Sequence, residues 1–510
     1  MGIASLPNAV PVSVPEVFKR THGPSLRVAE VVSALSQALD LGSGSTRWHS
    51  VRTCILGMRV AAELRLDEEI QEDLYYGLLL KDAGCSSNAS QIYRALASDD
   101  IAAKRDVKKT DWTRLNWESL QYALSHVSPG RPFLERVRAI LTIAAKQKQH
   151  TREVTAIRCE RGARMARVMG LPEGTAEAIG GLDEHWDAGG NPNGLRGAEI
   201  PISSRIMLLA QTLDVFRMSE GPEQALRVIK ERSGRWFDPD VVAAANSLAS
   251  GQKLWDERDL GDPLTVVLRS EPGERTLSDS DVSLDAVCQA FASIVDAKSP
   301  FTFNHSNGVA NAAVEIARRL DFPPARVLFI RHAALLHDIG KMAVSNAILE
   351  KPGKPDEAEW QVLRAHPLHT WNILRSISGF EELSEVAASH HEKLDGTGYH
   401  RGLTAAQLPL ESRVLVVADI FDALAAKRPY RDALPLPKVF EIMRKGTPRA
   451  LDPLCVEALE QSTFACDQSF VDLQTLQARL AQEDLSSRPP VASQEAEPSV
   501  ELATVSSKVF

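Results

Sequence analysis

Histidine and aspartate side chains that could bind metal ions gather in the C-terminal part of the chain. Eight of the 13 histidines lie between positions 305 and 400. His305 lies four residues before Val309 on the apolar face of a predicted helix, and another acid follows the apolar run VLVVA. Burying an unpaired carboxylate costs several kcal/mol. We therefore interpret the whole set as ligands that converge on metal ions in a helical core: His305, His337, Asp338, His366, His390, His391 and Asp419.

The number and type of these ligands predict two metal ions. Five imidazoles and two carboxylates are too many for one tetrahedral site, but they suit two adjacent six-coordinate ions with water ligands. The mixed nitrogen and oxygen set, without thiolates, favours Fe or Mn and leaves other divalent ions open. A single histidine on an apolar helix face is more often a hydrogen-bonded core residue. We apply that interpretation to His332, His369 and His400 and assign them no metal.

Helices must position these ligands, because apolar residues recur mainly with helical spacing. One example is the series Leu284, Val287, Cys288, Phe291, Ile294 and Val295, which follows one helix face. Strand-like alternation is rare, so we expect an all-α fold. The stretch 251–281 reads as a linker that could hold one short strand, TVVL.

Internal similarity indicates a tandem duplication. VVSALSQALDL at 31–41 parallels VCQAFASIVDA at 287–297, and LLLKDAG at 78–84 parallels ALLHDIG at 334–340, both at an offset of 256. Further on, the segment 183–216 parallels 391–424 at an offset of 208, so the first copy carries 48 extra residues. We expect one helical domain at 26–250, with an extra helical segment at about 89–157, and a second at 282–465.

Composition limits the function classes. The 510 residues carry a net charge of -9, which disfavours a broad basic surface for a nucleic-acid polymer. No apolar run is long enough to span a membrane, and no signal peptide is evident. The six cysteines are scattered, as in reduced cytoplasmic proteins, so we expect a cytoplasmic location. Residues 1–25 read as a leader and 483–510 as a disordered tail.

The second copy resembles the HD-GYP class of HD-domain phosphohydrolases. The resemblance rests on the ordered segments FNHSNGVA, ALLHDIGKMAV, ILEKPG, HHEKLDGTGYHRGL and VADIFDALAAKRPYR, which together cover about 285–460. It implies a helical bundle that hydrolyses cyclic di-GMP to pGpG and, in some members, to GMP. Two divalent ions would lower the pKa of a water molecule and stabilise charge on the phosphoryl oxygens.

The resemblance also assigns roles to residues of this sequence. His305, His337, Asp338 and Asp419 would hold one ion. Asp338 would bridge to a second ion, and the remaining ligands of that ion would be His366, His390 and His391. Lys341 would face the scissile phosphate, and Asp338 and Lys341 form the implied catalytic pair. The implied substrate-binding residues are Lys341, Gly396, Gly398, Tyr399, Arg428 and Arg431.

Two positions depart from the family pattern. Phe301 stands where some members carry a glutamate for a third ion, which predicts a binuclear site and leaves the final product open between pGpG and GMP. The family tripeptide Gly-Tyr-Pro is Gly398-Tyr399-His400 here. This change puts partner recognition and substrate affinity in question more than the chemistry.

The first copy lacks most of the ligand set. Under the two offsets it keeps His49 and Asp82, but five of the seven ligands are replaced. Lys81 and Arg158 put cations where metal ions would sit, and together with Asp82 and Asp183 they predict a charge-paired replacement of the centre. Two interpretations stay open, a packed scaffold and a regulatory or ligand-sensing domain. We interpret the basic run AKRDVKK at 103–109 as a solvated helix face.

The leading hypothesis is therefore a metal-dependent cyclic di-GMP phosphodiesterase of bacterial second-messenger signalling. Two alternatives remain, namely an HD phosphohydrolase acting on another cyclic dinucleotide or nucleotide, and a slow-turnover nucleotide-binding adaptor. A homodimer or a signalling protein as partner is left open. The full ligand set beside HDIGK is the observation that favours an enzyme.

Overall fold

The computed structural model describes residues 26–111, 117–256, 261–277, 282–300, 304–426 and 433–465. Within these ranges the secondary structure is helical, with four isolated bridges and no strand. The expected all-α class is therefore confirmed. The predicted leader at 1–25, the predicted tail at 483–510, Phe301, Arg428 and Arg431 lie outside the described residues.

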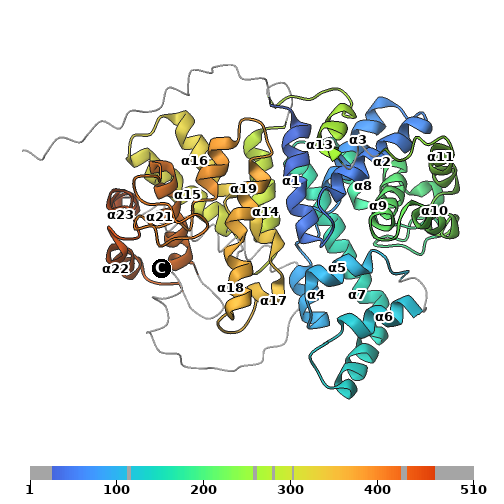
Figure 1. Cartoon of the computed structure of the whole chain (residues 1–510), viewed down its shortest axis with the longest axis horizontal. Helices are drawn as coiled ribbons and strands as arrows, with labels where there is room; N and C mark the ends of the chain where they lie inside the picture. Colours follow the sequence, from blue (N-terminus) through green and yellow to red (C-terminus); the bar gives the residue numbers. More distant parts are fainter. Residues whose placement is uncertain are drawn as a thin grey trace, which may run out of the picture.

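The first copy is a bundle of helices on one side of the molecule (Figure 1). It contains α1 (Val28–Gly42), α2 (His49–Glu63), α3 (Glu68–Leu80), α4 (Ala89–Leu96), α5 (Asp100–Val107), α6 (Trp117–His126), α7 (Phe133–Val168), α8 (Glu173–Gly180), η2 (Gly197–Glu199), α9 (Ile202–Glu220), α10 (Pro222–Glu231) and α11 (Pro239–Ser250). The segment predicted as extra in this copy is formed by α4, α5, α6 and the first part of α7.

The second copy lies beside the first (Figure 1). It contains α14 (Leu284–Asp296), α15 (His305–Arg319), α16 (Pro324–Leu336), η3 (Ile339–Ala343), α17 (Asn346–Leu349), α18 (Glu357–Arg364), α19 (His366–Leu374), α20 (Glu381–Ala387), α21 (Leu410–Ala425), α22 (Leu436–Gly446) and α23 (Pro453–Ala465). Local signals explain where these helices begin. The Ser283 hydroxyl accepts a hydrogen bond from the amide of Ala286 at 3.1 Å, which caps α14.

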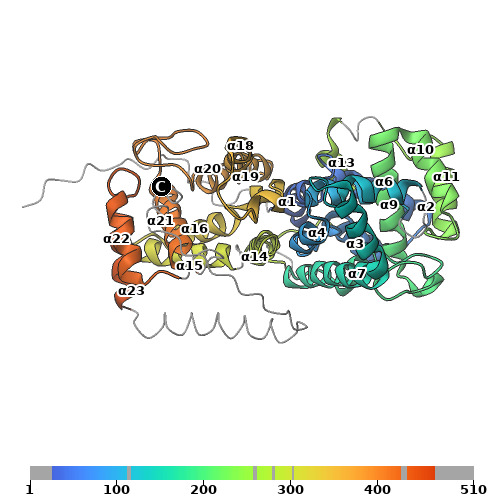
Figure 2. The same ribbon diagram turned by 90° about the horizontal axis from the view of Figure 1, so that it is seen from below.

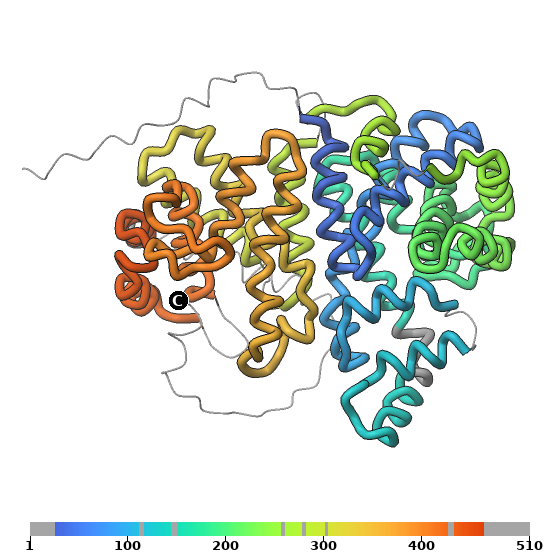
Figure 3. Tube along the Cα trace, in the orientation of Figure 1, coloured from blue at the N-terminus to red at the C-terminus, as the bar shows by residue number. Residues whose placement is uncertain are grey.

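The two copies share details that helical packing alone would not require. Asp40 accepts hydrogen bonds from the amide and hydroxyl of Ser50, at 3.0 and 2.7 Å. Asp296 holds Ser306 in the same way, with its hydroxyl at 2.7 Å. Both pairs are buried and are related by the offset of 256. The tandem arrangement seen in the sequence is therefore present in the fold, as the trace of the chain also shows (Figure 3).

The copies pack against each other through α1, which lies against η3 and α19 of the second copy. α7 also packs on α14, and α4 on α17, so α1, α4 and α7 of the first copy all take part in the contact (Figure 2). Buried apolar residues from both copies form one continuous core. The close approach is visible at Gly42, where an added Cβ would lie 2.3 Å from Cε of Met342.

The short strand expected at TVVL is wrong, because these residues lie in α13 (Pro263–Arg269). Asp262 caps this helix at the amide of Thr265, and Pro263 stands at its first position, where its missing N–H costs nothing. The hydroxyl of Tyr75 donates to the carbonyl of Val267 at 3.2 Å. The stretch read as a linker thus packs on the first copy, and tertiary contacts override its β-branched composition. Within the described residues no helix is both long and apolar enough to cross a membrane.

Candidate metal centre

The seven predicted metal ligands lie at helix ends and on one inward helix face of the second copy. His305 is the first residue of α15, His366 is the first residue of α19, and His337 and Asp338 form the junction between α16 and η3. The two remaining histidines follow the end of α20, and Asp419 lies inside α21. Six of the seven are buried and His391 is partly buried. Because most of these residues lie at helix ends, their side chains can converge on one place although they come from distant segments of the chain.

Asp338 lies at the centre of the cluster. Its Oδ2 atom is 3.6 Å from Nε2 of His305 and 3.3 Å from Nε2 of His337. Asp419 completes this side, with Oδ1 3.2 Å from Nε2 of His305 and 4.0 Å from Nε2 of His337. Ligand atoms of His305, His337 and Asp419 all lie within 4.8 Å of one another, as a shared ion requires.

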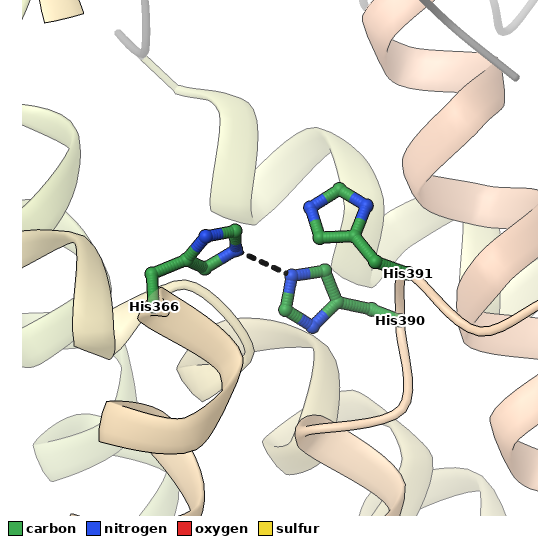
Figure 4. Close-up of side chains that lie close together, drawn as sticks. All are labelled: His366, His390 and His391. Atoms are coloured by element: carbon green, nitrogen blue, oxygen red, sulfur yellow. Dashed lines mark hydrogen bonds between the residues drawn. The ribbon is translucent and has the colours of Figure 1, made fainter. Parts of the chain in front are cut away.

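The other carboxylate oxygen of Asp338 faces a second group of histidines. Its Oδ1 atom is 3.3 Å from Nε2 of His366 and 3.6 Å from Nε2 of His390. Those two nitrogens are 2.9 Å apart. The rings of His366, His390 and His391 approach one another from α19 and from the turn after α20 (Figure 4), and their nitrogens also lie within 4.8 Å of one another. The two oxygens of one carboxylate therefore face two separate ligand groups.

The remaining ring nitrogens are held by backbone carbonyls. Nδ1 of His337 donates to the carbonyl of Ala334 at 2.6 Å, and Nδ1 of His366 donates to that of Leu363 at 2.6 Å. His390 makes the same contact one turn back, at 2.7 Å. Each hydrogen bond places the proton on Nδ1 and leaves Nε2 free as an acceptor that faces the cluster, the usual outer-shell arrangement for metal-binding histidines.

Two atoms at the centre lack hydrogen-bond partners although they are fully buried. They are Nε2 of His337 and Oδ1 of Asp338. A buried polar atom without a partner costs about 1–3 kcal/mol, and one divalent cation on each side of Asp338 would satisfy these two atoms. The donor set contains imidazole nitrogens and carboxylate oxygens, which suit Fe, Mn and other divalent ions. The residues present therefore fit the predicted ions.

The ionisation states differ across the cluster. Burial disfavours the charged forms of His305 and His337, but the carboxylates around them raise the pKa of His305 to about 10 and that of His337 above its ordinary value. Burial opposes ionisation of Asp338, but the neighbouring charges of His337 and Lys341 hold its pKa well below its usual range. Burial and the adjacent His391 lower the pKa of His390 well below its ordinary value. Ionised carboxylate and neutral imidazole are the forms that bind metal ions, so Asp338 and His390 favour the binding form, whereas an ion would displace a proton from His305 and His337.

The sequence reasoning missed Asp422, which orients His305. Nδ1 of His305 is 2.6 Å from Oδ2 of Asp422. Asp419 and Asp422 are three residues apart on α21, so they share one helix face. This three-residue spacing from Asp419 is the feature of the sequence that could have identified Asp422 as a residue near the site. An added Cβ at Gly308 would lie 1.9 Å from Oδ1 of Asp422, so the glycine makes room for this carboxylate.

Lys341 lies beside the cluster and keeps partial access to solvent. Its ammonium group pairs with Oδ2 of Asp338, and 21% of its side chain is exposed. It is therefore the cation at the open side of the centre. His332, His369 and His400 do not belong to the ligand groups found among the described residues. Nε2 of His332 lies 3.4 Å from Asp285, and His400 lies beside the ring of Trp371.

The loop after the paired histidines is shaped by glycines. Gly396 has a φ of +76°, a conformation that other residues rarely adopt. An added Cβ at Gly398 would lie 2.5–2.7 Å from the backbone of residues 391–393, so Gly398 lets the loop pack directly on the histidine segment. The ring of Tyr399 consequently stacks on His391, with centroids 4.7 Å apart. The peptide bond between Tyr399 and His400 is cis.

The equivalent region of the first copy holds ion pairs. Lys81 is buried and pairs with Asp82, and Arg158 pairs with Asp183, as the sequence predicted. His49 keeps its orienting partner, with Nδ1 2.7 Å from a carboxylate oxygen on α9. Cations of the protein itself therefore neutralise the acids of this copy.

The interpretation of 103–109 as a solvated face is wrong for two of its lysines. Lys108 reaches Asp82, with Nζ 3.2 Å from Oδ2, and only 10% of its side chain is exposed. Lys104 pairs with Asp100 at 3.0 Å and is also buried. Both lysines turn inward because buried carboxylates lie on that face. The spacing of charges in the sequence shows which lysines share a helix face, but it does not show whether that face contacts solvent or buried carboxylates.

Comparison with known proteins identifies the family. The HD domain family matches residues 138–241 and 289–454, one span in each copy. The chain is a member of the HD-domain family. As an HD-domain phosphohydrolase it is 42% identical over 446 residues to "3'3'-cGAMP-specific phosphodiesterase 3" of Vibrio cholerae, covering 88% of this chain and 96% of that protein.

Two further comparisons cover different shares of this HD-domain protein. The crystal structure of a cyclic GMP-AMP specific phosphodiesterase of V. cholerae aligns over 86% of this chain and 98% of its own, with a TM-score of 0.58 and 37% identity. "Cyclic di-GMP phosphodiesterase response regulator RpfG" of Xanthomonas campestris is 36% identical over 173 residues, which is 34% of this chain and 46% of that protein.

Proposed function

We propose that this HD-domain protein is a metal-dependent phosphodiesterase that hydrolyses a cyclic dinucleotide, and that 3'3'-cGAMP is its preferred substrate. The observation that carries the proposal is the position of Asp338, whose two oxygens face two groups of ligand nitrogens. A carboxylate in that position is suited to bridge two ions. His305, His337 and Asp419 would complete one site, and His366, His390 and His391 the other.

Each part of the site has a task in this reaction. Two bound ions would supply a water with a lowered pKa and positive charge beside the phosphoryl oxygens. Asp338, with the histidines held at their Nδ1 atoms, fixes the positions at which that charge acts. Lys341 reaches the solvent-facing side, where its ammonium group can donate hydrogen bonds to a non-bridging phosphoryl oxygen.

The reaction is a hydrolysis. The oxygen of water forms a bond to phosphorus, the bond from phosphorus to the ribose 3' oxygen breaks, and that oxygen takes up a proton. The first product is a linear dinucleotide with a 5'-phosphate. Positioning and charge stabilisation account for most catalysis of phosphoryl transfer, which agrees with a site made of rigidly held ligands.

The choice of substrate rests on how far each relative extends. The relative named for 3'3'-cGAMP matches 88% of this chain and therefore both copies. Relatives named for cyclic di-GMP match smaller shares of the chain, for example 34% and 39%. Cyclic di-GMP, the substrate implied by the motifs of the second copy alone, is the second candidate, because those motifs carry the metal chemistry common to both reactions.

The test is turnover by the purified full chain loaded with Mn²⁺ or Fe²⁺. Each cyclic dinucleotide is supplied alone, and the products are separated and identified by mass. We expect kcat/KM for 3'3'-cGAMP to exceed that for cyclic di-GMP by about tenfold or more, a difference in transition-state binding of about 1.4 kcal/mol. A preference for cyclic di-GMP would overturn the substrate assignment. Hydrolysis of neither by the metal-loaded protein would overturn the function.

A further inference from the structure

Asp100 of the first copy binds the backbone of the second copy just beyond the Asp338–Lys341 segment. Its Oδ1 atom accepts a hydrogen bond from the amide of Asn346 at 2.7 Å and from the hydroxyl of Ser345 at 3.1 Å. Asp100 is fully buried. A carboxylate from one copy thus satisfies the first amide of α17 in the other copy, a group that has no partner within its own helix.

A second buried contact holds the same segment from the side of α14. Lys298 donates a hydrogen bond to the carbonyl of Met342 at 2.7 Å, and Met342 is the residue after Lys341. The amide side chain of Asn346 donates to the carbonyl of Lys298 at 2.7 Å. These contacts link the end of α14, η3 and the start of α17 into one network.

The charge of Asp100 contributes to this network. Lys298 is 1% exposed, and burial lowers its pKa to about 7. The carboxylate of Asp100 opposes that shift and favours the charged ammonium. Lys104, one turn along α5, pairs with Oδ2 of Asp100 at 3.0 Å and so keeps the carboxylate in place.

The first copy adds a further contact next to this one. Glu350, at the end of α17, accepts a hydrogen bond from the hydroxyl of Ser90 at 3.1 Å, and Arg94 lies 3.4 Å away. Both residues belong to α4. The extra segment of the first copy therefore contacts both ends of α17, which follows η3 after only two residues.

We propose that Asp100 is a positioning residue for the catalytic segment of the second copy: it fixes η3 through Ser345 and Asn346, and thereby fixes Asp338 and Lys341. This assignment deepens the proposed function and rests on it. The physical reason is the short distance along the chain, because Asp100 binds the side chain of the fourth residue after Lys341 and the backbone amide of the fifth. The segment is then held on one side by Asp100 and Lys298, and on the other by Thr370, whose hydroxyl accepts from the amide of Gly340 at 3.0 Å.

The same helix also reaches the ion pairs of the first copy. α5 starts at Asp100, in contact with α17, and ends beside Lys108, which pairs with Asp82. A helix of eight residues thus connects the buried charge cluster of the first copy to the catalytic segment of the second. Through α5, the packing of the first copy can therefore affect the positions of Asp338 and Lys341 in the second copy.

The test compares Asp100→Ala with Asp99→Ala in the full chain. Asp99 is the matched control, because it is exposed, caps α5 itself at the amides of Ile101 and Ala102, and acts on Lys298 of the second copy through its charge rather than through a hydrogen bond. For Asp100→Ala we expect kcat to fall about 100-fold, the effect of a displacement of about 1 Å at a catalytic group. KM should change less than threefold. Asp100→Asn keeps an oxygen acceptor and should recover part of the loss.

Hydrogen exchange of the peptide that covers residues 339–350 supplies a readout that does not need activity. It should be faster in Asp100→Ala than in the wild type, with and without Mn²⁺, and unchanged in Asp99→Ala. Equal exchange and equal kcat in Asp100→Ala and the wild type would overturn the proposal. So would an equal loss in Asp99→Ala, since that would reflect the stability of α5 alone. If the wild type hydrolyses neither dinucleotide, the proposed function fails while the exchange data still decide the role of Asp100.

Discussion

His305, which is buried, and Asp422, which is partly buried, form a pair in which Nδ1 of the histidine lies 2.6 Å from Oδ2 of the carboxylate. The first copy has the same pair, His49 and Asp214, at 2.7 Å. There the carboxylate also binds the guanidinium of Arg52 at 2.7 Å. The pair is present where the ligands are complete and where they are replaced. It therefore serves the fold of both copies, and in the second copy it also presents Nε2 of His305 to the candidate metal centre.

The first prediction concerns that pair. Asp422→Asn should lower the affinity for Mn²⁺ about 10–100-fold, because an outer-shell carboxylate fixes the ring and raises its basicity. Titration of the metal-free protein with Mn²⁺ measures the effect. Asp285→Asn is the control, since Asp285 contacts His332, a histidine outside the ligand groups. An unchanged affinity in Asp422→Asn would show that His305 needs no orienting partner.

The second prediction concerns Asp338 itself. Asp338→Ala removes the carboxylate that faces both sets of histidines, so hydrolysis should fall about 1,000-fold or more, equivalent to several kcal/mol of lost stabilisation. Circular dichroism should show the same helix content as the wild type. Turnover of the proposed substrate by the metal-loaded variant gives the answer, and activity equal to that of the wild type would contradict the mechanism.

The third prediction concerns the number of ions. The wild type should bind two Fe or Mn ions per chain, and His366→Ala should lose one of them because three histidines make up most of that site. Elemental analysis after loading and desalting measures both. His332→Ala should keep two ions, since this histidine is buried but lies outside the cluster. One ion per wild-type chain would disprove the binuclear assignment.

The fourth prediction concerns the first copy. Lys81→Ala should leave the metal content unchanged, because Lys81 occupies the place of a ligand and pairs with Asp82. Removing one member of a buried ion pair costs about 3 kcal/mol, so the variant should be less stable. Lys108 stays near Asp82 and limits the loss. Thermal unfolding and elemental analysis are measured together, and a halved metal content would show that the first copy binds an ion.

Sequence patterns alone predicted the helical class, the tandem arrangement and the ligand residue types, because periodicity and repeated motifs are local properties of the chain. They also predicted the ion pairs of Lys81 and Arg158, since the offsets place each cation beside an acid. The strand at TVVL was wrong, because residues 265–268 join a helix that packs on the first copy.

Only the tertiary structure decided which groups meet. In the structure the predicted ligands lie in two groups, one at each carboxylate oxygen of Asp338, and Asp422 contacts His305. The side chains of Lys104 and Lys108 point inward to buried carboxylates. It also brought Asp100 to the amide of Asn346, a contact between residues 246 positions apart. Such contacts depend on how whole helices pack. The spacing of residues within one segment, such as α5, does not show which segment of the other copy packs against it.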